Sequence, residues 1–231
     1  SVADIPSAGS GLGSSSSFLV GAINSIGKYL NIKLSQKDLA EIACRIEINN
    51  LKKPIGMQDQ YNAAYGGLNW YKFYNNNVRV TKLKINNNRL KKFEESLFLY
   101  YSDITRKSQI ILKNVKKNKN SNQLKKISQL SLDFKNNLIN GDLNLLGEIL
   151  HEAWILKKQL SKNTSNKYID NIYNYGINSG ATGGKLLGAG GGGFLIFFFK
   201  NKNKNKFKKK MKKFKLINFN FYNKGSEIIY S

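Results

Sequence analysis

The chain has 231 residues, of which 41% are hydrophobic and 12% aromatic, so it can bury a sizeable core. Its 38 basic and 14 acidic residues give a formal net charge of +24, which ordinarily suggests a nucleic-acid partner. No membrane segment is expected, because the apolar run from Phe194 to Phe199 is far shorter than the roughly 18 to 20 residues that span a bilayer.

The first element is a glycine-rich turn that leads into a serine-rich helix start, PSAGSGLGSSSS, from Pro6 to Ser17. Its glycines permit positive φ and let successive N–H groups converge on one anion, while the apolar helix that follows presents its positive end. The lysine of a P-loop is not found here, so a metal is expected to share the charge, with Ser14 or Ser15 contributing a hydroxyl. A flexible linker is the alternative, which Leu12 and the apolar helix disfavour.

Two carboxylates follow twelve residues apart, Glu47 and Asp59. Ser35 and Asp38 predict a capping box at the start of a helix, and Glu47 falls at the edge of that helix's buried face. From its own position alone, Glu47 is predicted to be a surface residue that pairs with a nearby basic side chain. Asp59 is in the same way predicted to cap a helix.

Hydrophobic periodicity and turn residues predict the remaining elements. In residues 142–160 Trp154 is expected in the core and Lys157 in solvent, and the lone His151 cannot build a histidine-based metal site. We expect strands over 70–73, 78–85, 97–101, 195–199 and 217–221, and helices over 110–114 and beyond, 124–139, 142–160, 169–177 and 208–216.

The lysines gather in two segments, Lys113 to Lys126 and Lys200 to Lys215, where asparagine alternates with them. We interpret both as solvated, compositionally biased surface and expect no nucleic-acid partner, since neither has a zinc-finger, RRM or KH signature. A basic nucleic-acid-binding protein is kept as an alternative. The single Cys44 and the lack of a secretion signal favour a reducing cytoplasm.

The pattern P-x-x-x-G-L-G-S-S, preceded by Asp4-Ile5, resembles the second motif of the galactokinase, homoserine kinase, mevalonate kinase and phosphomevalonate kinase (GHMP) superfamily. The glycine-rich segment 183–194 resembles its third motif. This resemblance implies an α+β, two-layer kinase fold. Residues 1–90 would be the remainder of an N-terminal ATP-binding domain, similar to a ribosomal-protein domain and truncated upstream, and residues 91–231 a ferredoxin-like C-terminal domain.

The resemblance also implies an ATP and Mg²⁺ site. Asp59 would be the catalytic carboxylate that approaches the acceptor hydroxyl, either as a base or only to orient it, and Ser15 and Glu47 would bind Mg²⁺. The residues expected to contact the nucleotide are Pro6, Gly9, Gly11, Leu12, Gly13, Ser14, Ser15, Ser16, Gly190 and Gly191.

Within the superfamily the motifs look most like those of the heptose-phosphate kinases, which implies a sugar phosphate, heptose 7-phosphate, as acceptor. Asp103 stands where that group has Gly, and Met57 where it has Lys. A related sugar 1-kinase for fucose or galactose and an inactive fragment remain alternatives, and the sequence does not predict the oligomeric state. The substrate residues expected are Gln58, Tyr65, Gly66, Arg106 and Lys185.

Overall fold

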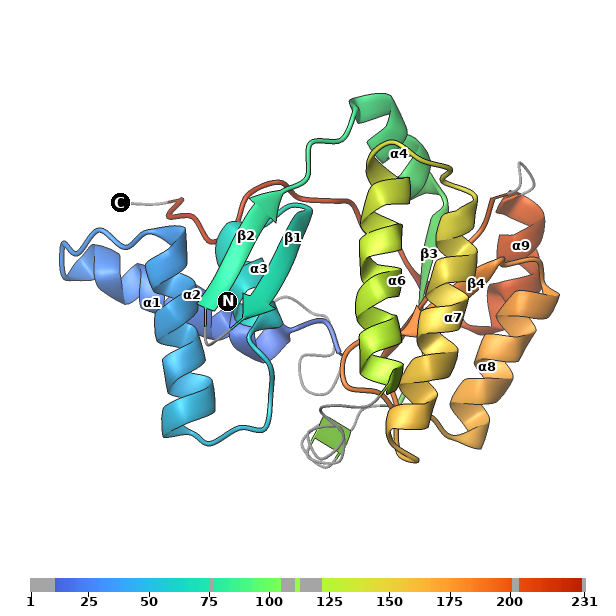
Figure 1. Cartoon of the computed structure of the whole chain (residues 1–231), viewed down its shortest axis with the longest axis horizontal. Coiled ribbons are helices and arrows are strands. Elements are labelled where there is room, and N and C mark those ends of the chain that lie inside the picture. Colours follow the sequence, from blue (N-terminus) through green and yellow to red (C-terminus); the bar gives the residue numbers. More distant parts are fainter. Residues whose placement is uncertain (1–10, 75–76, 105–110, 113–121, 201–203, 230–231) are drawn as a thin grey trace. The chain divides into compact units, whose positions relative to one another are not determined.

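The computed structural model describes residues 11–74, 77–104, 111–112, 122–200 and 204–229. These described residues divide into two compact units, one made of those in 13–83 and 221–229 and the other of those in 11–12 and 84–220. Both contain helices and antiparallel sheet (Figure 1), which confirms the α+β class. No helix in the described ranges is long and apolar enough to cross a membrane. The domain boundary near residue 90 stays a prediction.

The first unit packs three α-helices against a two-stranded hairpin (Figure 1). The predicted capping box is confirmed, because the Asp38 N–H donates to Ser35 Oγ at 3.1 Å and the Ser35 N–H donates to Asp38 Oδ2 at 2.9 Å. Val20, Leu39 and Tyr61 lie in its core. The elements are α1 (Ser14–Tyr29), α2 (Gln36–Cys44), a π-helix (Arg45–Asn50), α3 (Gln58–Tyr65), β1 (Asn69–Tyr74) and β2 (Asn77–Lys82).

The second unit is a four-stranded antiparallel sheet in the order β4-β5-β3-β6, with α6, α7 and α8 side by side across it (Figure 1). Phe98 and Tyr100 lie opposite Phe197 and Leu195, so aromatic side chains fill the core beneath the helices. The elements are α4 (Asn87–Glu95), β3 (Leu97–Tyr101), α6 (Asn122–Ile139), α7 (Leu145–Leu160), α8 (Lys167–Asn178), β4 (Gly183–Leu186), β5 (Phe194–Phe198), α9 (Lys204–Lys210), a 3₁₀ turn (Met211–Lys213) and β6 (Lys215–Ile217).

Several predicted elements need correction. The helix expected over 208–216 is wrong, because α9 ends at Lys210 and Lys215–Ile217 pairs with β3 instead. The final strand over 217–221 is also wrong, since β6 ends at Ile217. An open sheet edge offers backbone partners that override a helical period. The helix α4 was not predicted, because Phe93 is its only buried residue. Of the helix expected from 110 to 114, only 111–112 lie within the described residues.

The C-terminal segment 222–226 lies along α3 and the residues just after it. The Gly67 N–H donates to the Tyr222 carbonyl at 2.8 Å, and the Ser226 N–H donates to the Ala63 carbonyl at 3.0 Å. Gly66 has φ +60°, and a Cβ built on it would lie 2.0 Å from the carbonyl oxygen of Lys224. Only glycine therefore allows the two backbones to approach this closely.

We predict that Gly66→Ala destabilises the first unit by at least about 2 kcal/mol, because the added methyl group overlaps the Lys224 carbonyl at a strained φ. The free energy of unfolding in urea is the measurement. The control is Gly21→Ala in α1, where a Cβ meets nothing within 4 Å and a gain of up to about 1 kcal/mol is expected. Equal stability of the two variants would contradict the close packing described here.

Candidate active site

The π-helix Arg45–Asn50 turns the Glu47 side chain into the first unit. Its wider turn is closed by a hydrogen bond from the Leu51 N–H to the Ile46 carbonyl at 2.9 Å, and it directly continues α2. Single π-turns of this kind often occur at functional sites. Glu47 is 1% exposed, so the interpretation of this residue as a surface salt bridge with Arg45 or Lys52 is wrong.

The Glu47 carboxylate accepts four hydrogen bonds. Ser15 Oγ donates to Oε1 at 2.9 Å, and Ser16 Oγ donates to Oε2 at 2.7 Å. Lys53 Nζ donates to Oε1 at 2.9 Å, and Gln60 Nε2 donates to Oε2 at 2.6 Å. This one carboxylate therefore connects the start of α1, the turn after the π-helix and the first turn of α3.

Burial raises the pKa of Glu47, but hydrogen bonds from Lys53, Ser16, Ser15 and Gln60 together outweigh it and place the pKa below its usual value. Glu47 is therefore ionised at neutral pH. Gln60 is fully buried, and its Oε1 has no hydrogen-bond partner in the part of the chain that the structure describes. That oxygen is a free acceptor beside an ionised carboxylate.

Asp59 lies at the start of α3, next to the start of α1. A Cβ built on Gly13 would lie 3.3 Å from both Cβ and Cγ of Asp59, so a side chain at position 13 would crowd this carboxylate. Partial burial, and then repulsion from Glu47, raise the pKa of Asp59. The residue is nevertheless exposed, which leaves the carboxylate open to a ligand.

In the second unit, residues 187 and 188 lie against Gly11. A Cβ on Gly11 would lie 3.0 Å from the Leu187 carbonyl oxygen, and one on Gly188 would lie 2.5 Å from the Gly11 Cα. Lys157 Nζ donates to the carbonyls of Leu186 at 3.1 Å and Gly188 at 2.6 Å. The expectation that Lys157 is solvated holds only in part, since its side chain is half-buried and its ammonium binds protein carbonyls, whereas the core position of Trp154 is confirmed.

Burial lowers the pKa of Lys157 to about 7, and repulsion from Lys185 adds to the effect. Burial likewise lowers the pKa of Lys185. The helical spacing could have indicated that Lys157 lies toward the buried face of α7. It is three residues after Trp154 and three before Leu160, and both of these residues are buried. Lys53 carried no comparable signal in the sequence.

Gly190 and Gly191 pack against the turn at Thr164. The Gly191 N–H donates to the Thr164 carbonyl at 2.8 Å, and a Cβ on Gly190 would lie 2.6 Å from the same oxygen. Their backbone therefore contacts protein at this position. Their predicted role in nucleotide binding stays a prediction.

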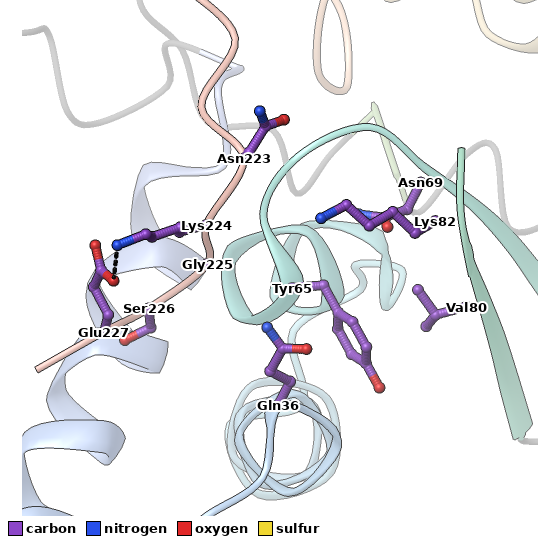
Figure 2. Close-up of a pocket in the computed structure, with 10 residues that line it drawn as sticks. All are labelled: Gln36, Tyr65, Asn69, Val80, Lys82, Asn223, Lys224, Gly225, Ser226 and Glu227. Carbon is purple, nitrogen blue, oxygen red and sulfur yellow. Dashed lines mark ion pairs between the residues drawn. The ribbon is translucent and has the colours of Figure 1, made fainter. Parts of the chain in front are cut away.

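A pocket of about 470 Å³ lies at the other end of α3 from Asp59. Figure 2 shows Tyr65 beside Gln36 and Val80, with the C-terminal segment and the ion pair between Lys224 and Glu227, 3.0 Å apart, along another side. Tyr65 lies six positions after Asp59 in α3, which places the two residues about 9 Å apart along the helix axis. The structure does not bring Tyr65 and Gly66 to Asp59.

The predicted site residues thus fall into groups. Ser15, Ser16 and Glu47 are in contact in the first unit, where Gly13 and Asp59 also lie together and Gln58 is exposed at the start of α3. Ser14 begins α1. Gly11, Leu12, Lys185, Gly190 and Gly191 belong to the second unit, while Pro6, Gly9 and Arg106 lie outside the described residues.

The oxygens of Ser15 and Glu47 suit a magnesium ion that takes its other ligands from phosphate groups and water. The described residues contain no cluster of three or more His, Cys, Asp or Glu side chains that would hold a metal alone. A lysine ammonium already lies against both oxygens, which shows that the position accommodates a cation.

Comparison with known families agrees with this arrangement. Residues 2–67 match the family described as the GHMP kinases N terminal domain, and residues 134–215 match the one described as GHMP kinases C terminal. The chain belongs to the GHMP kinase family. The resemblance drawn from the two glycine-rich motifs and the fold implied by it are therefore confirmed.

Among individual proteins, the chain is 37% identical over 197 residues to the D-glycero-alpha-D-manno-heptose 7-phosphate kinase of Campylobacter jejuni, covering 83% of this chain and 58% of that protein. A crystal structure of a D-glycero-D-manno-heptose 1-phosphate kinase from Bacteroides thetaiotaomicron is 28% identical with a TM-score of 0.78, covering 99% of this chain and 66% of that one. A sugar kinase structure from Campylobacter jejuni is 36% identical with a TM-score of 0.76, covering 96% and 65%. The chain thus spans less than two thirds of these relatives.

We predict that Glu47→Gln destabilises the first unit by about 2–4 kcal/mol, because the amide loses the ion pair with Lys53 and its nitrogen faces hydrogen-bond donors. Urea unfolding measures the change. Glu41→Gln is the matched control, because Glu41 forms a solvent-exposed ion pair with Lys37 at 3.7 Å. Its loss should change the free energy of unfolding by no more than about 0.5 kcal/mol. Similar losses in the two variants would contradict the assigned network.

We also predict a pH-dependent stability that arises from Lys157. Because its pKa falls from 10.5 to about 7, the unfolded chain binds more protons between these values, and the free energy of unfolding rises with pH in that window. Lys157→Met should flatten the rise in urea midpoint from pH 7 to 9.5. Lys158→Met, which removes a lysine paired with Asp170 at 3.2 Å, should leave the slope unchanged, and equal slopes in both variants would disprove the assignment.

Proposed function

We propose that this chain forms part of an ATP-dependent sugar kinase that uses Mg²⁺. The observation that carries the proposal is the pair of hydrogen bonds from Ser15 and Ser16, at the start of α1, to the buried Glu47. They join a helix start suited to phosphate with a carboxylate suited to a metal. Membership of the GHMP kinase family supports the same reading.

On the nucleotide side, the backbone N–H groups at the start of α1 would bind phosphate oxygens, and Ser15 and Glu47 would hold Mg²⁺. A bound metal would supply positive charge that offsets the negative charge of the phosphates. Glu47 is ionised, as a metal ligand must be, and Gln60 and Ser16 fix the orientation of its carboxylate.

On the acceptor side, Asp59 would accept a hydrogen bond from the sugar hydroxyl. A bond forms between that hydroxyl oxygen and the γ-phosphorus while the bond to the β–γ bridging oxygen breaks, and ADP leaves. The hydroxyl proton passes to Asp59 or to water. The raised pKa of Asp59 favours proton acceptance, and its exposure permits a simple orienting role equally well.

We propose heptose 7-phosphate as the acceptor and its anomeric hydroxyl as the site of transfer, which gives the 1,7-bisphosphate. The relative that is 37% identical and named for this substrate supports the choice. Gln58, Arg106 and Lys185 are the substrate contacts we propose with it. An ADP-release assay against heptose 7-phosphate, free heptose, galactose and fucose tests it, with the chain alone and extended at its N terminus. Turnover of free hexoses alone would favour a different sugar kinase.

We predict that Asp59→Asn lowers kcat at least about 100-fold and changes KM little, because the amide cannot accept the proton and orients the hydroxyl poorly. Steady-state ADP release is the measurement. Glu152→Gln, which removes an exposed carboxylate from α7, should retain wild-type kcat. Full activity of Asp59→Asn would remove Asp59 from the reaction.

A further inference from the structure

The ammonium of Lys53 lies against both oxygens that we assign to the metal. Lys53 Nζ is 2.9 Å from Glu47 Oε1 and 3.2 Å from Ser15 Oγ, and these two oxygens are themselves 2.9 Å apart. The three atoms form a closed triangle. A positive charge therefore already occupies the space beside the proposed metal ligands.

The carboxylate has no unused acceptor position. Its Oε2 accepts from Ser16 and Gln60, and its Oε1 accepts from Ser15 and Lys53, which fills the four lone-pair positions that a carboxylate offers. A metal that binds Oε1 must therefore displace one donor. Ser16 and Gln60 bind the other oxygen and are buried, so they can remain in place.

The two donors on Oε1 respond differently to a metal. Ser15 can rotate its hydroxyl proton away and turn a lone pair toward the ion, because a hydroxyl is both donor and acceptor. Lys53 has no lone pair when charged and is repelled by a second cation at about 3 Å. Of these two groups, Lys53 is the one that has to leave.

The structure also allows Lys53 to leave without moving the backbone. The Lys53 N–H donates to the Glu47 carbonyl at 2.9 Å, which fixes the main chain at this point. The side chain is 30% exposed and has a flexible four-carbon stem, so the ammonium has a path to solvent.

We propose that Lys53 competes with the metal, its ammonium occupying the position between Ser15 and Glu47 until a divalent cation displaces it. Lys53 is thus a positioning residue that sets how much metal the site requires and keeps Glu47 paired when no metal is bound. The inference rests on the proposed function only through the assignment of Ser15 and Glu47 as the metal ligands.

Titration with Mn²⁺ alone tests this, with the free ion followed by its electron paramagnetic resonance signal. If Lys53 occupies the position about 90% of the time, Lys53→Met should bind Mn²⁺ about tenfold more tightly than the wild type. Lys52→Met is the matched control, because it removes the same charge from the adjacent exposed lysine. Equal Mn²⁺ affinity of the two variants overturns the proposal, and so does a gain that survives the further change Glu47→Gln.

A second measurement needs no variant. Acetylation of Lys53 in the wild-type chain, followed by mass spectrometry, should rise at least about threefold when Mn²⁺ is added, while that of Lys52 should not change. No rise at Lys53 overturns the competition. Both results are independent of turnover, so a chain that binds Mn²⁺ as proposed but phosphorylates no sugar refutes the kinase proposal alone, and a working kinase with unchanged Mn²⁺ affinity refutes only the role of Lys53.

Discussion

A single buried carboxylate joins three separate parts of the first unit. Glu47 is almost fully removed from solvent, and an ionised group in that position is tolerated only when it is paired and hydrogen-bonded. Its partners come from α1, from the turn after the π-helix and from α3. The serine-rich helix start and the amide of Gln60 therefore stabilise the buried charge by hydrogen bonds, and the π-turn places the carboxylate where these groups reach it.

Close backbone packing has the same importance in other parts of the molecule. Gly66 permits the C-terminal segment to lie on the end of α3, and in the second unit Gly188 permits residues 187 and 188 to lie on Gly11. A glycine in a sequence can therefore indicate close approach of a ligand or close approach of another backbone segment. At Gly66 the structure shows contact with another backbone segment, and a sequence motif alone does not distinguish the two cases.

Local features were predicted best. The capping box at Ser35 and the strand Leu97–Tyr101 follow from short-range hydrogen bonding and from apolar runs, and both are confirmed. The strand Lys215–Ile217 was missed, because a lysine-rich amphipathic period predicts a helix and only pairing with β3 shows otherwise. The burial of Glu47 and the hydrogen bonds from Lys157 to distant carbonyls were missed for a related reason, since charged residues are expected in solvent unless a distant partner is known.

The sequence by itself determined the family, the fold class and the two glycine-rich motifs, because these depend on residues close together in the chain. The resemblance already implied that Ser15 and Glu47 share a metal, and the structure joins them by a hydrogen bond across 32 positions. Only the tertiary structure placed the ammonium of Lys53 beside both. The physical reason is that a hydrogen bond between distant residues depends on how helices pack, and packing is a property of the whole core rather than of any local pattern.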